Sequence, residues 1–336
     1  MVYVIAMGQQ TMKKNRFRMF LAPALALALG FCAHGITHAQ QGRQWKDGKW
    51  ASLPQPKEGT AGGELALAQK HFDAGKYSKA IKAVKKILKR YPLSGAGEAA
   101  TLLAGESEMR RGHYMAAFEW FEKQLSGYPG GEFSERALTR EYEIADAFLN
   151  GRKRRMMKIF RVSAVGDGLD IMLRVAEHAP GSKLAQKAVL RIGDHHYEKG
   201  NWPDAVDAYD NFVRLFAKAD QAEYATLRSA RATLAQFEGL EHDETPLIDA
   251  RQRFVSFSES FGPESALRAD VIGAVKQIDE TRAAKAVNII QFYLRTNKPK
   301  SAAYYCRLVM KDFPETSAAQ KAGQILAKID PSVSGG

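Results

Sequence analysis

The residues best suited to chemistry form one short cluster, Asp194-His195-His196, and their spacing argues against a metal site. Neighbouring residues on a helix point about 100° apart, so these side chains do not converge on one ion. His196 also falls where a helical repeat usually buries an aromatic side chain, which favours a core or rim histidine. The sequence has no phosphate loop, His-Glu-x-x-His, Cys-x-x-Cys or nucleophile elbow. We therefore expect a protein without enzymatic activity, cofactor or metal.

A run of four cations, Arg152-Lys153-Arg154-Arg155, is the next candidate for chemistry. We interpret it as a solvated loop, and the alternative is contact with lipid or with an acidic partner. The triplet Gly166-Asp167-Gly168 has no strand before it, so it is typical of the start of a helix rather than of a phosphate-binding turn. Binding rather than catalysis is the activity that these patterns favour.

A recurring Tyr-Pro-x-Ser mark predicts that the chain is an array of helices. Proline disfavours the α conformation of the residue before it, and a Ser or Thr two residues later accepts hydrogen bonds from the first amides of the next helix. Each mark therefore predicts the end of one helix and the start of another. The copies and variants are Tyr91-Pro92-Leu93-Ser94, Tyr128-Pro129-Gly130-Gly131, Ala179-Pro180-Gly181-Ser182, Gly262-Pro263-Glu264-Ser265 and Phe313-Pro314-Glu315-Thr316.

Other residue types recur in register with the marks. Gly75-Lys76-Tyr77 is echoed 37 residues later by Gly112-His113-Tyr114. A glycine in the turn, an aromatic residue opening the second helix, a small residue at the helix crossing and a closing proline form the tetratricopeptide signature. Gly105 and Gly193 occupy the small position of the first helix. The small positions of the second helix and the third copy of the turn are Ala80, Ala117, Ala205, Gly200 and Trp202.

These patterns predict an all-α fold, a tetratricopeptide-repeat superhelix of about five to six helix pairs. Because the marks are unevenly spaced, we predict a degenerate mark in which Ala217 replaces proline and Asp220 caps the next helix. The third repeat carries an insertion after Asn150-Gly151. The predicted segments are N-terminal repeats at 63–178, with the insertion at 150–165, and C-terminal repeats at 179–330.

The first 39 residues are typical of a secretory signal. A basic cluster precedes the apolar run Met19 to Phe31, and Thr37-His38-Ala39 suits a cleavage site before Gln40. Cleavage there removes four cations and lowers the net charge from +12 to +8. Export favours acidic partners and anionic lipid over nucleic acid as counterparts of this charge. The four cations are Lys13, Lys14, Arg16 and Arg18.

A lipid anchor at Cys32 is the alternative to cleavage after residue 39. Phe31 is larger than the small residue that lipoprotein processing requires before the cysteine, so we predict an unlipidated chain. Residues 40–62 are polar and lack a helical period, which predicts a flexible tether. Trp45 and Trp50 within it suit packing on the protein itself or on a partner.

Stacked first helices of such repeats line a concave groove that holds an extended peptide. Counted from the turn glycines, the first-helix residues not needed within a helix pair mix apolar and polar types, which suits a peptide with aromatic and charged ends. The alternative is that they only pack against a neighbouring helix. The predicted peptide-binding groove consists of Leu65, Gln69, Phe72, Asp73, Leu102, Glu106, Met109 and Arg110.

The C-terminal segment carries a specific family resemblance. It contains Lys298-Pro299-Lys300-Ser301-Ala302-Ala303, then Arg307, then Lys311-Asp312-Phe313-Pro314-Glu315-Thr316. This segment resembles the last repeats of the BamD family, tetratricopeptide subunits of the outer-membrane β-barrel assembly machinery, and the likeness extends over about residues 61–330. It implies a non-enzymatic adaptor whose C-terminal repeats dock on BamA through Arg307 and whose N-terminal repeats receive unfolded outer-membrane proteins.

The implied location is the periplasm, at the inner face of the outer membrane. A periplasmic scaffold for cell-wall or envelope-division proteins is the alternative function, because it uses the same repeats; residues 40–62 lack the heptads of the coiled coil that such scaffolds often carry. A lytic transglycosylase with a helical-repeat arm is the third, and it has no candidate catalytic residues here. For Arg307, the alternative to docking is a structural role beside Ala303.

Overall fold

The computed structural model describes residues 43–46, 49–52, 57, 59–156 and 160–330. The chain divides into two compact units, Met1–Gln55 and Pro56–Gly336. The predicted secretory signal at 1–39 and the alternative anchor at Cys32 lie outside the described residues. They stay predictions.

The first unit contains a short antiparallel ribbon. Strand β1 (Arg43–Lys46) pairs with β2 (Lys49–Ser52), and the backbones of Trp45 and Trp50 are direct partners. The flexible tether predicted for residues 40–62 did not anticipate this pairing, and helix α1 begins inside that range. The missed signal is Asp47-Gly48, which is typical of a two-residue hairpin connection.

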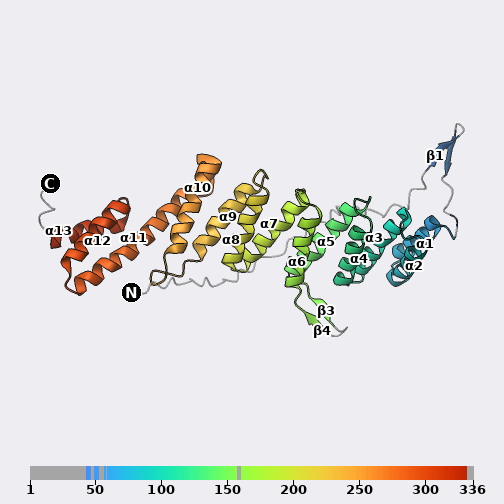
Figure 1. The fold of residues 1–336 in the computed structure, drawn as a ribbon, viewed down its shortest axis with the longest axis horizontal. Coiled ribbons are helices and arrows are strands. Elements are labelled where there is room, and N and C mark those ends of the chain that lie inside the picture. The colour runs from blue at the N-terminus through green and yellow to red at the C-terminus, as the bar shows by residue number, and fades with distance from the viewer. Residues whose placement is uncertain (1–42, 47–48, 53–56, 58, 157–159, 331–336) are drawn as a thin grey trace, which may run out of the picture. The chain divides into compact units, whose positions relative to one another are not determined.

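The second unit is a succession of helices in which each helix packs against the next one in the chain (Figure 1). The described residues form thirteen helices, which make six pairs and a closing helix. The predicted all-α tetratricopeptide fold is thereby confirmed. The helices are α1 (Ala61–Asp73), α2 (Tyr77–Arg90), α3 (Gly95–Arg110), α4 (Tyr114–Gly127), α5 (Ser134–Leu149), α6 (Val165–His178), α7 (Lys183–Glu198), α8 (Trp202–Leu215), α9 (Ala222–Ala235), α10 (Thr245–Arg268), α11 (Val271–Arg295), α12 (Pro299–Asp312) and α13 (Ser317–Ile329).

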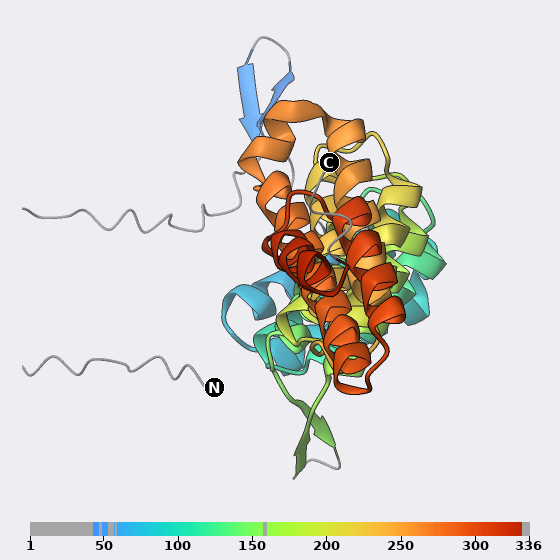
Figure 2. The same cartoon turned by 90° about the vertical axis from the view of Figure 1, so that its left-hand side faces the viewer.

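The insertion after Asn150-Gly151 forms a hairpin between α5 and α6. Strand β3 (Arg154–Met156) pairs in antiparallel fashion with β4 (Phe160–Val162). The hairpin projects from the neighbouring helices in both views (Figures 1 and 2). The basic run interpreted as a loop therefore continues into a paired strand.

In five of the six helix pairs, the turn after the first helix has one geometry that requires a positive φ. At the end of α1, the N–H of Gly75 donates to the carbonyl of Phe72 and that of Lys76 to the carbonyl of His71, both at 2.8 Å. Glycine tolerates this left-handed conformation because it lacks a β-carbon. The same pattern recurs with Asn in the last pair, and the φ values are 69° for Gly75, 75° for Gly112, 89° for Gly151, 72° for Gly200 and 54° for Asn297.

The turn between pairs is capped by the hydroxyls that the sequence predicts. Ser94, Ser182 and Thr316 each accept the backbone N–H three residues ahead, at 3.1, 3.0 and 3.1 Å. The tyrosine of the mark also joins successive repeats. The hydroxyl of Tyr91 donates to the carbonyl of Gly59 at 2.8 Å, and the hydroxyl of Tyr128 donates to the carbonyl of Pro92.

A carboxylate from the preceding repeat serves where the mark lacks a hydroxyl. The mark that follows Tyr128 has Gly131 in place of serine, and there Glu98 accepts the N–H of Phe133 at 3.1 Å. At α13, which Thr316 already caps, Glu280 of the preceding repeat also accepts the N–H of Ser317, at 2.9 Å. Helix starts are therefore stabilised across repeat boundaries.

Two predicted caps differ from the structure. The N-cap of α9 is Gln221, which makes no side-chain capping bond, so the prediction that Asp220 caps this helix is wrong. The fourth mark does separate two helical segments, because the chain kinks at Gly262, with φ 80° and ψ 174°, within the span of α10. Ser265 lies inside the second segment, where its hydroxyl accepts from Arg268.

The helix crossings confirm the small positions inferred from the sequence. A β-carbon at Gly105 would lie 2.3 Å from Phe121, and one at Gly193 would lie 2.8 Å from Tyr209. Both rings are fully buried, at 0% exposed, so neither has free space to move into. In each of these pairs the two helices lie so close that the aromatic ring of one helix occupies the space that a side chain at the glycine of the other would take.

We expect Gly105→Ala to destabilise the protein by about 1–3 kcal/mol, because the added methyl overlaps a ring that cannot swing away. Gly127→Ala is the matched control, since Gly127 lies in α4 with no atom within 4 Å of the β-carbon position. Alanine there is expected to be neutral or to stabilise by up to about 1 kcal/mol. Urea unfolding followed by circular dichroism measures both, and equal stability of the two variants contradicts the tight crossing.

Candidate partner-binding surfaces

The apolar residues of the predicted groove lie mainly against the repeat core. Leu65 and Phe72 are half-buried and pack on the cluster that contains Val84 and Ile87. The ring of Phe72 also stands edge-to-face on Tyr77, with 5.5 Å between centroids. Both side chains present only part of their surface to a ligand.

Leu102 was predicted to line the groove, and this prediction is wrong. Its side chain is 5% exposed and belongs to the core that contains Phe121 and Phe148, so it is unavailable to a peptide. Met109 is partly buried against the same core. The sequence count misplaced Leu102 because a first helix packs on the following repeat as well as on its own partner. For these two residues, the alternative of helix packing is the better description.

Three polar residues of the predicted groove, Gln69, Asp73 and Arg110, are exposed, whereas the side chain of Glu106 is only 14% exposed. Gln69 donates to Asp73 at 2.8 Å on the exposed side of α1. Glu106 forms ion pairs with Arg136 at 2.6 Å and Arg140 at 3.4 Å, which joins α3 to α5. Arg110 is exposed, and no described side chain forms an ion pair with it. Arg110 is the one cation among the eight predicted groove residues, and it is accessible to an incoming carboxylate. That it binds one stays a prediction.

Polar contacts of this kind continue from one first helix to the next. Arg191 of α7 donates to Asp146 of α5 at 2.8 Å and to Asn150 at 3.0 Å. Asp194 of α7 accepts from the hydroxyl of Tyr224 on α9 at 2.8 Å. We call this series the first-helix ladder, and its residues are Glu106, Arg140, Asp146, Arg191, Asp194 and Tyr224.

Burial and charge fix the protonation of the ladder. Burial raises the pKa of Tyr224 above its usual value, and its bond to Asp194 adds to this effect. Burial opposes the charge of Arg191, but the bonded Asp146 raises the pKa of the guanidinium above its ordinary value. At neutral pH the phenol of Tyr224 is therefore neutral, and the guanidiniums of the ladder are charged. Sequence reasoning missed it, although the acidic residues recur once per repeat on the first helices.

The Asp194-His195-His196 segment is used for packing. Asp194 also accepts from Tyr209 of α8 at 2.7 Å. His195 is buried, which lowers its pKa, and the Nδ1 atom of His196 lies 3.6 Å from Asp204. Within the described part of the chain, no three His, Cys, Asp or Glu side chains are placed to hold a metal ion.

The predicted docking residue Arg307 is paired within the chain. Its Nη2 lies 2.7 Å from Asp330 Oδ2, and the arginine side chain is 54% exposed. Ala303, one turn earlier, is buried against the last core cluster. Both roles weighed for Arg307, docking and structural, are compatible with this geometry. A docking partner has to compete with Asp330 for the guanidinium.

Exposed apolar residues lie near this C-terminal end of the array. A cavity of about 510 Å³ is lined by Leu240, Ile289 and Phe292, of which Phe292 is 51% exposed. A second cavity of about 380 Å³ lies between α11 and the turn at Phe313, beside Ile272. Protein partners commonly occupy such apolar surfaces rimmed by polar residues.

Glu141 of α5 is a fully buried acid in the third repeat. Neither carboxyl oxygen has a hydrogen-bond partner among the described residues. Burial raises its pKa to about 9, with Glu122 adding to the shift and Arg174 opposing it. The side chain is therefore protonated at neutral pH, because an unpaired charge at this depth is costly.

Comparison with known proteins agrees with the repeat fold. Residues 65–132 match a tetratricopeptide-repeat family, and residues 166–332 match the YfiO family, described as an outer membrane lipoprotein. No curated protein matches the sequence. The chain thus has a tetratricopeptide-repeat fold. Its C-terminal half is similar to an outer-membrane lipoprotein family, whereas its N-terminal repeats match only the general repeat, which supports part of the expected resemblance over 61–330.

Similar solved structures are also repeat proteins. The C-terminal part of a TPR repeat-containing protein from Cytophaga hutchinsonii is 14% identical, with 79% of this chain and 88% of that chain covered and a TM-score of 0.35. A tetratricopeptide repeat protein from Parabacteroides merdae is 13% identical, with coverages of 80% and 98% and a TM-score of 0.32. PilW, a type IV pilus biogenesis factor, is 15% identical, with coverages of 79% and 99% and a TM-score of 0.27.

No helix in the described segments is both long enough and apolar enough to cross a bilayer.

Glu141 predicts a stability that falls as pH rises. The folded-state pKa of about 9 lies above the usual 4.5, so the unfolded chain loses this proton first and stability is lost between these values. We expect the free energy of unfolding to drop by about 2–3 kcal/mol from pH 5 to pH 7.5. Glu141→Gln removes this dependence, whereas Glu177→Gln, at an exposed position on α6, retains it. Urea unfolding at several pH values measures both, and an unchanged slope in Glu141→Gln contradicts the assignment.

Proposed function

We propose that this protein is a non-enzymatic adaptor of the outer-membrane β-barrel assembly machinery, working on the periplasmic side of the outer membrane. The match of residues 166–332 to an outer membrane lipoprotein family carries the proposal. A repeat array supports it, because such arrays present long surfaces to other proteins. In this proposal the two ends of the array have different partners.

The C-terminal repeats would dock on a BamA-like β-barrel protein through its periplasmic domains. Arg307 is suited to this contact, because a planar guanidinium binds a carboxylate through two parallel hydrogen bonds. Its present partner, Asp330, lies at the end of α13 and imitates such a carboxylate. A separate apolar surface on α11, at Ile289 and Phe292, would add contact area to the docking.

The N-terminal repeats would receive unfolded outer-membrane proteins. Arg110, on the last turn of α3, offers a cation with which no described side chain forms an ion pair. The rung between Glu106 and Arg140 offers both signs of charge beside it. Phe72 and Leu65 present partly exposed apolar surface in the preceding repeat. An extended client segment with a terminal carboxylate and an aromatic side chain matches these groups.

Arg307→Glu is expected to abolish capture of the periplasmic domains of BamA, because it replaces the attracting charge by a repelling one. Lys311→Glu is the matched control, since it changes the charge by the same amount at an exposed site one turn along α12. Pull-down with purified domains measures capture. Circular dichroism checks that both variants stay folded.

Asp330→Asn distinguishes docking from a structural role for Arg307. If Arg307 docks, removing the competing carboxylate leaves capture intact or strengthens it. If Arg307 serves only to hold the end of α13, Asp330→Asn loses capture to the same degree as Arg307→Glu, and the docking assignment fails.

Arg110→Glu is expected to weaken binding of C-terminal peptides from outer-membrane barrels by at least about 1 kcal/mol, because a cation that faces the terminal carboxylate is lost. Lys85→Glu makes the same charge change on α2, a second helix, and is expected to leave binding unchanged. Fluorescence polarisation with labelled peptides measures both. Equal weakening in the two variants would assign the effect to net charge and remove Arg110 from the site.

A further inference from the structure

The hairpin of the third repeat places two arginines directly opposite each other. Arg155 on β3 and Arg161 on β4 are cross-strand partners, and both side chains are exposed. Like charges at such positions destabilise a strand pair, because their β-carbons are only about 5 Å apart. An isolated three-residue ladder has little else to offset this repulsion.

Arg154, the neighbour of Arg155 in the same hairpin, has a carboxylate partner. Arg154 points to the other face of β3, where its Nε lies 3.1 Å from Asp167. No described carboxylate forms an ion pair with Arg155 or Arg161. The facing pair therefore has an unused capacity for an anion, whereas Arg154 does not.

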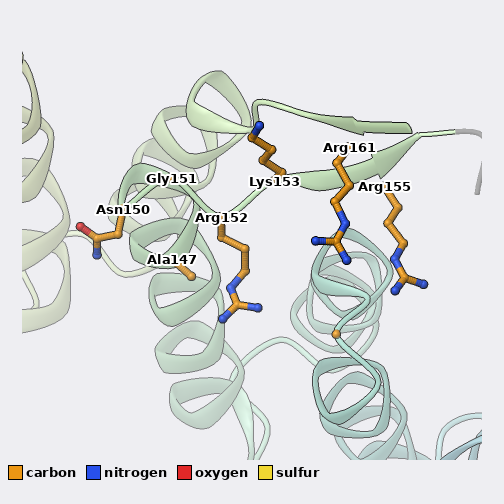
Figure 3. Close-up of a pocket in the computed structure, with 8 residues that line it drawn as sticks. Ala147, Asn150, Gly151, Arg152, Lys153, Arg155 and Arg161 are labelled. Atoms are coloured by element: carbon orange, nitrogen blue, oxygen red, sulfur yellow. The ribbon is translucent and has the colours of Figure 1, made fainter. Parts of the chain in front are cut away.

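Two more cations line the same cleft. Arg152 and Lys153, in the segment that leads from α5 into β3, line a cleft of about 780 Å³ together with Arg155 and Arg161. Figure 3 shows Arg155 and Arg161 side by side, both extending from the hairpin toward the helices beneath it. Gly112, in the turn between α3 and α4, also lines the cleft.

None of the described residues that line the cleft is acidic. Asn150, at its edge, is bonded to Asp146, which is itself paired with Arg191. Glu119 lines an adjoining cavity that shares Lys153 and Arg155. Arg152 stacks over the ring of Tyr114, with its Cζ atom 4.5 Å from the ring centroid. The cleft therefore keeps a strong excess of positive charge.

An exposed aromatic residue stands next to this charge. Phe160, the residue before Arg161, is 59% exposed on the projecting hairpin. Its backbone partner is Met156, so Phe160 lies one pair further along the hairpin than Arg161. Because successive residues of a strand point to opposite faces, Phe160 and Arg161 lie on opposite faces of the hairpin, with Phe160 nearer its tip. A hairpin end with cations on one face and an apolar side chain on the other suits the boundary between lipid tails and phosphate headgroups.

We propose that the β3–β4 hairpin binds the surface of a phospholipid bilayer, with lipid phosphates in the cleft between Arg155 and Arg161 and with Phe160 entering the headgroup region. Guanidinium pairs bind phosphate oxygens through two hydrogen bonds each, which relieves the repulsion between the two arginines. An acidic peptide would satisfy the charges but leave Phe160 without a role. This inference is independent of the proposed assembly role.

Vesicle co-sedimentation of the full chain tests the proposal. Vesicles that contain phosphatidylglycerol are expected to bind the protein, and vesicles of phosphatidylcholine alone are not. The double variant Arg155→Gln/Arg161→Gln is expected to weaken binding about 30-fold. Arg155→Lys/Arg161→Lys keeps the charge and is expected to retain most of the affinity.

Charge-matched and apolar controls make the result specific. Lys82→Gln/Lys86→Gln removes the same charge from exposed positions on α2 and is expected to leave binding unchanged. Phe160→Ser is expected to weaken binding about tenfold, whereas Leu93→Ser, which changes a residue that is 86% exposed, is not. Equal losses in either matched pair overturn the proposal.

The same assays identify a different occupant. Binding of a polyglutamate peptide without any vesicle binding would make the cleft an acidic-peptide site. Binding of inorganic phosphate alone, again without vesicles, would make it a site for a free anion. Either result overturns the assignment to lipid, and circular dichroism confirms that each variant is folded.

Discussion

Two helix crossings in this protein are so close that a glycine at the crossing could not carry a β-carbon. At Gly105 and Gly193 the first helix approaches its partner so closely that the rings of Phe121 and Tyr209 occupy the space of a side chain. A helix pair cannot bury both of its apolar faces alone, so the close crossing is useful only when another pair packs beside it. Core packing therefore continues from one repeat to the next. Leu102 of the second repeat, for example, lies in one cluster with Phe148 of the third.

Polar groups at the ends of helices likewise find their hydrogen-bond partners in the preceding repeat or turn. Glu98 accepts the first free amide ahead of α5, and Glu280 accepts that of α13. Tyr91 and Tyr128 donate to carbonyls of the preceding turn. Because hydrogen bonds to charged groups are stronger than neutral ones, these contacts fix the registry of the array as well as its stability. The first-helix ladder extends this registry along one face.

The third repeat concentrates the departures from the regular pattern. Its two helices are separated by the β3–β4 hairpin, and α5 carries the buried acid Glu141. A protonated carboxyl in the core lowers stability as pH rises, whereas the exposed cations of the hairpin add charge at the surface. Neither feature is required by helix pairing. Both are therefore candidates for function that is particular to this chain, beyond the adaptor role that its C-terminal half suggests.

Local residue types predicted most of the helix boundaries. Turn glycines such as Gly75 and capping residues such as Ser94 act through the backbone of their own segment, so their effect is visible in the sequence. The exceptions are instructive. Asp220 has the right type for a cap, yet Gln221 takes the N-cap position, because α9 begins one residue later than the mark predicts.

Only the tertiary structure decided which side chains are accessible to a binding partner. Leu102 and Arg110 are both first-helix residues, but one lies in the core and the other in solvent, since neighbouring repeats cover different parts of a helix. The pairing of Arg307 with Asp330, and of Arg155 with Arg161 across a hairpin, likewise depends on segments brought together by folding. Sequence therefore determined the repeat and its punctuation, which are local. Burial, charge pairing and the shape of each binding surface arise from contacts between repeats, and these only the folded chain specifies.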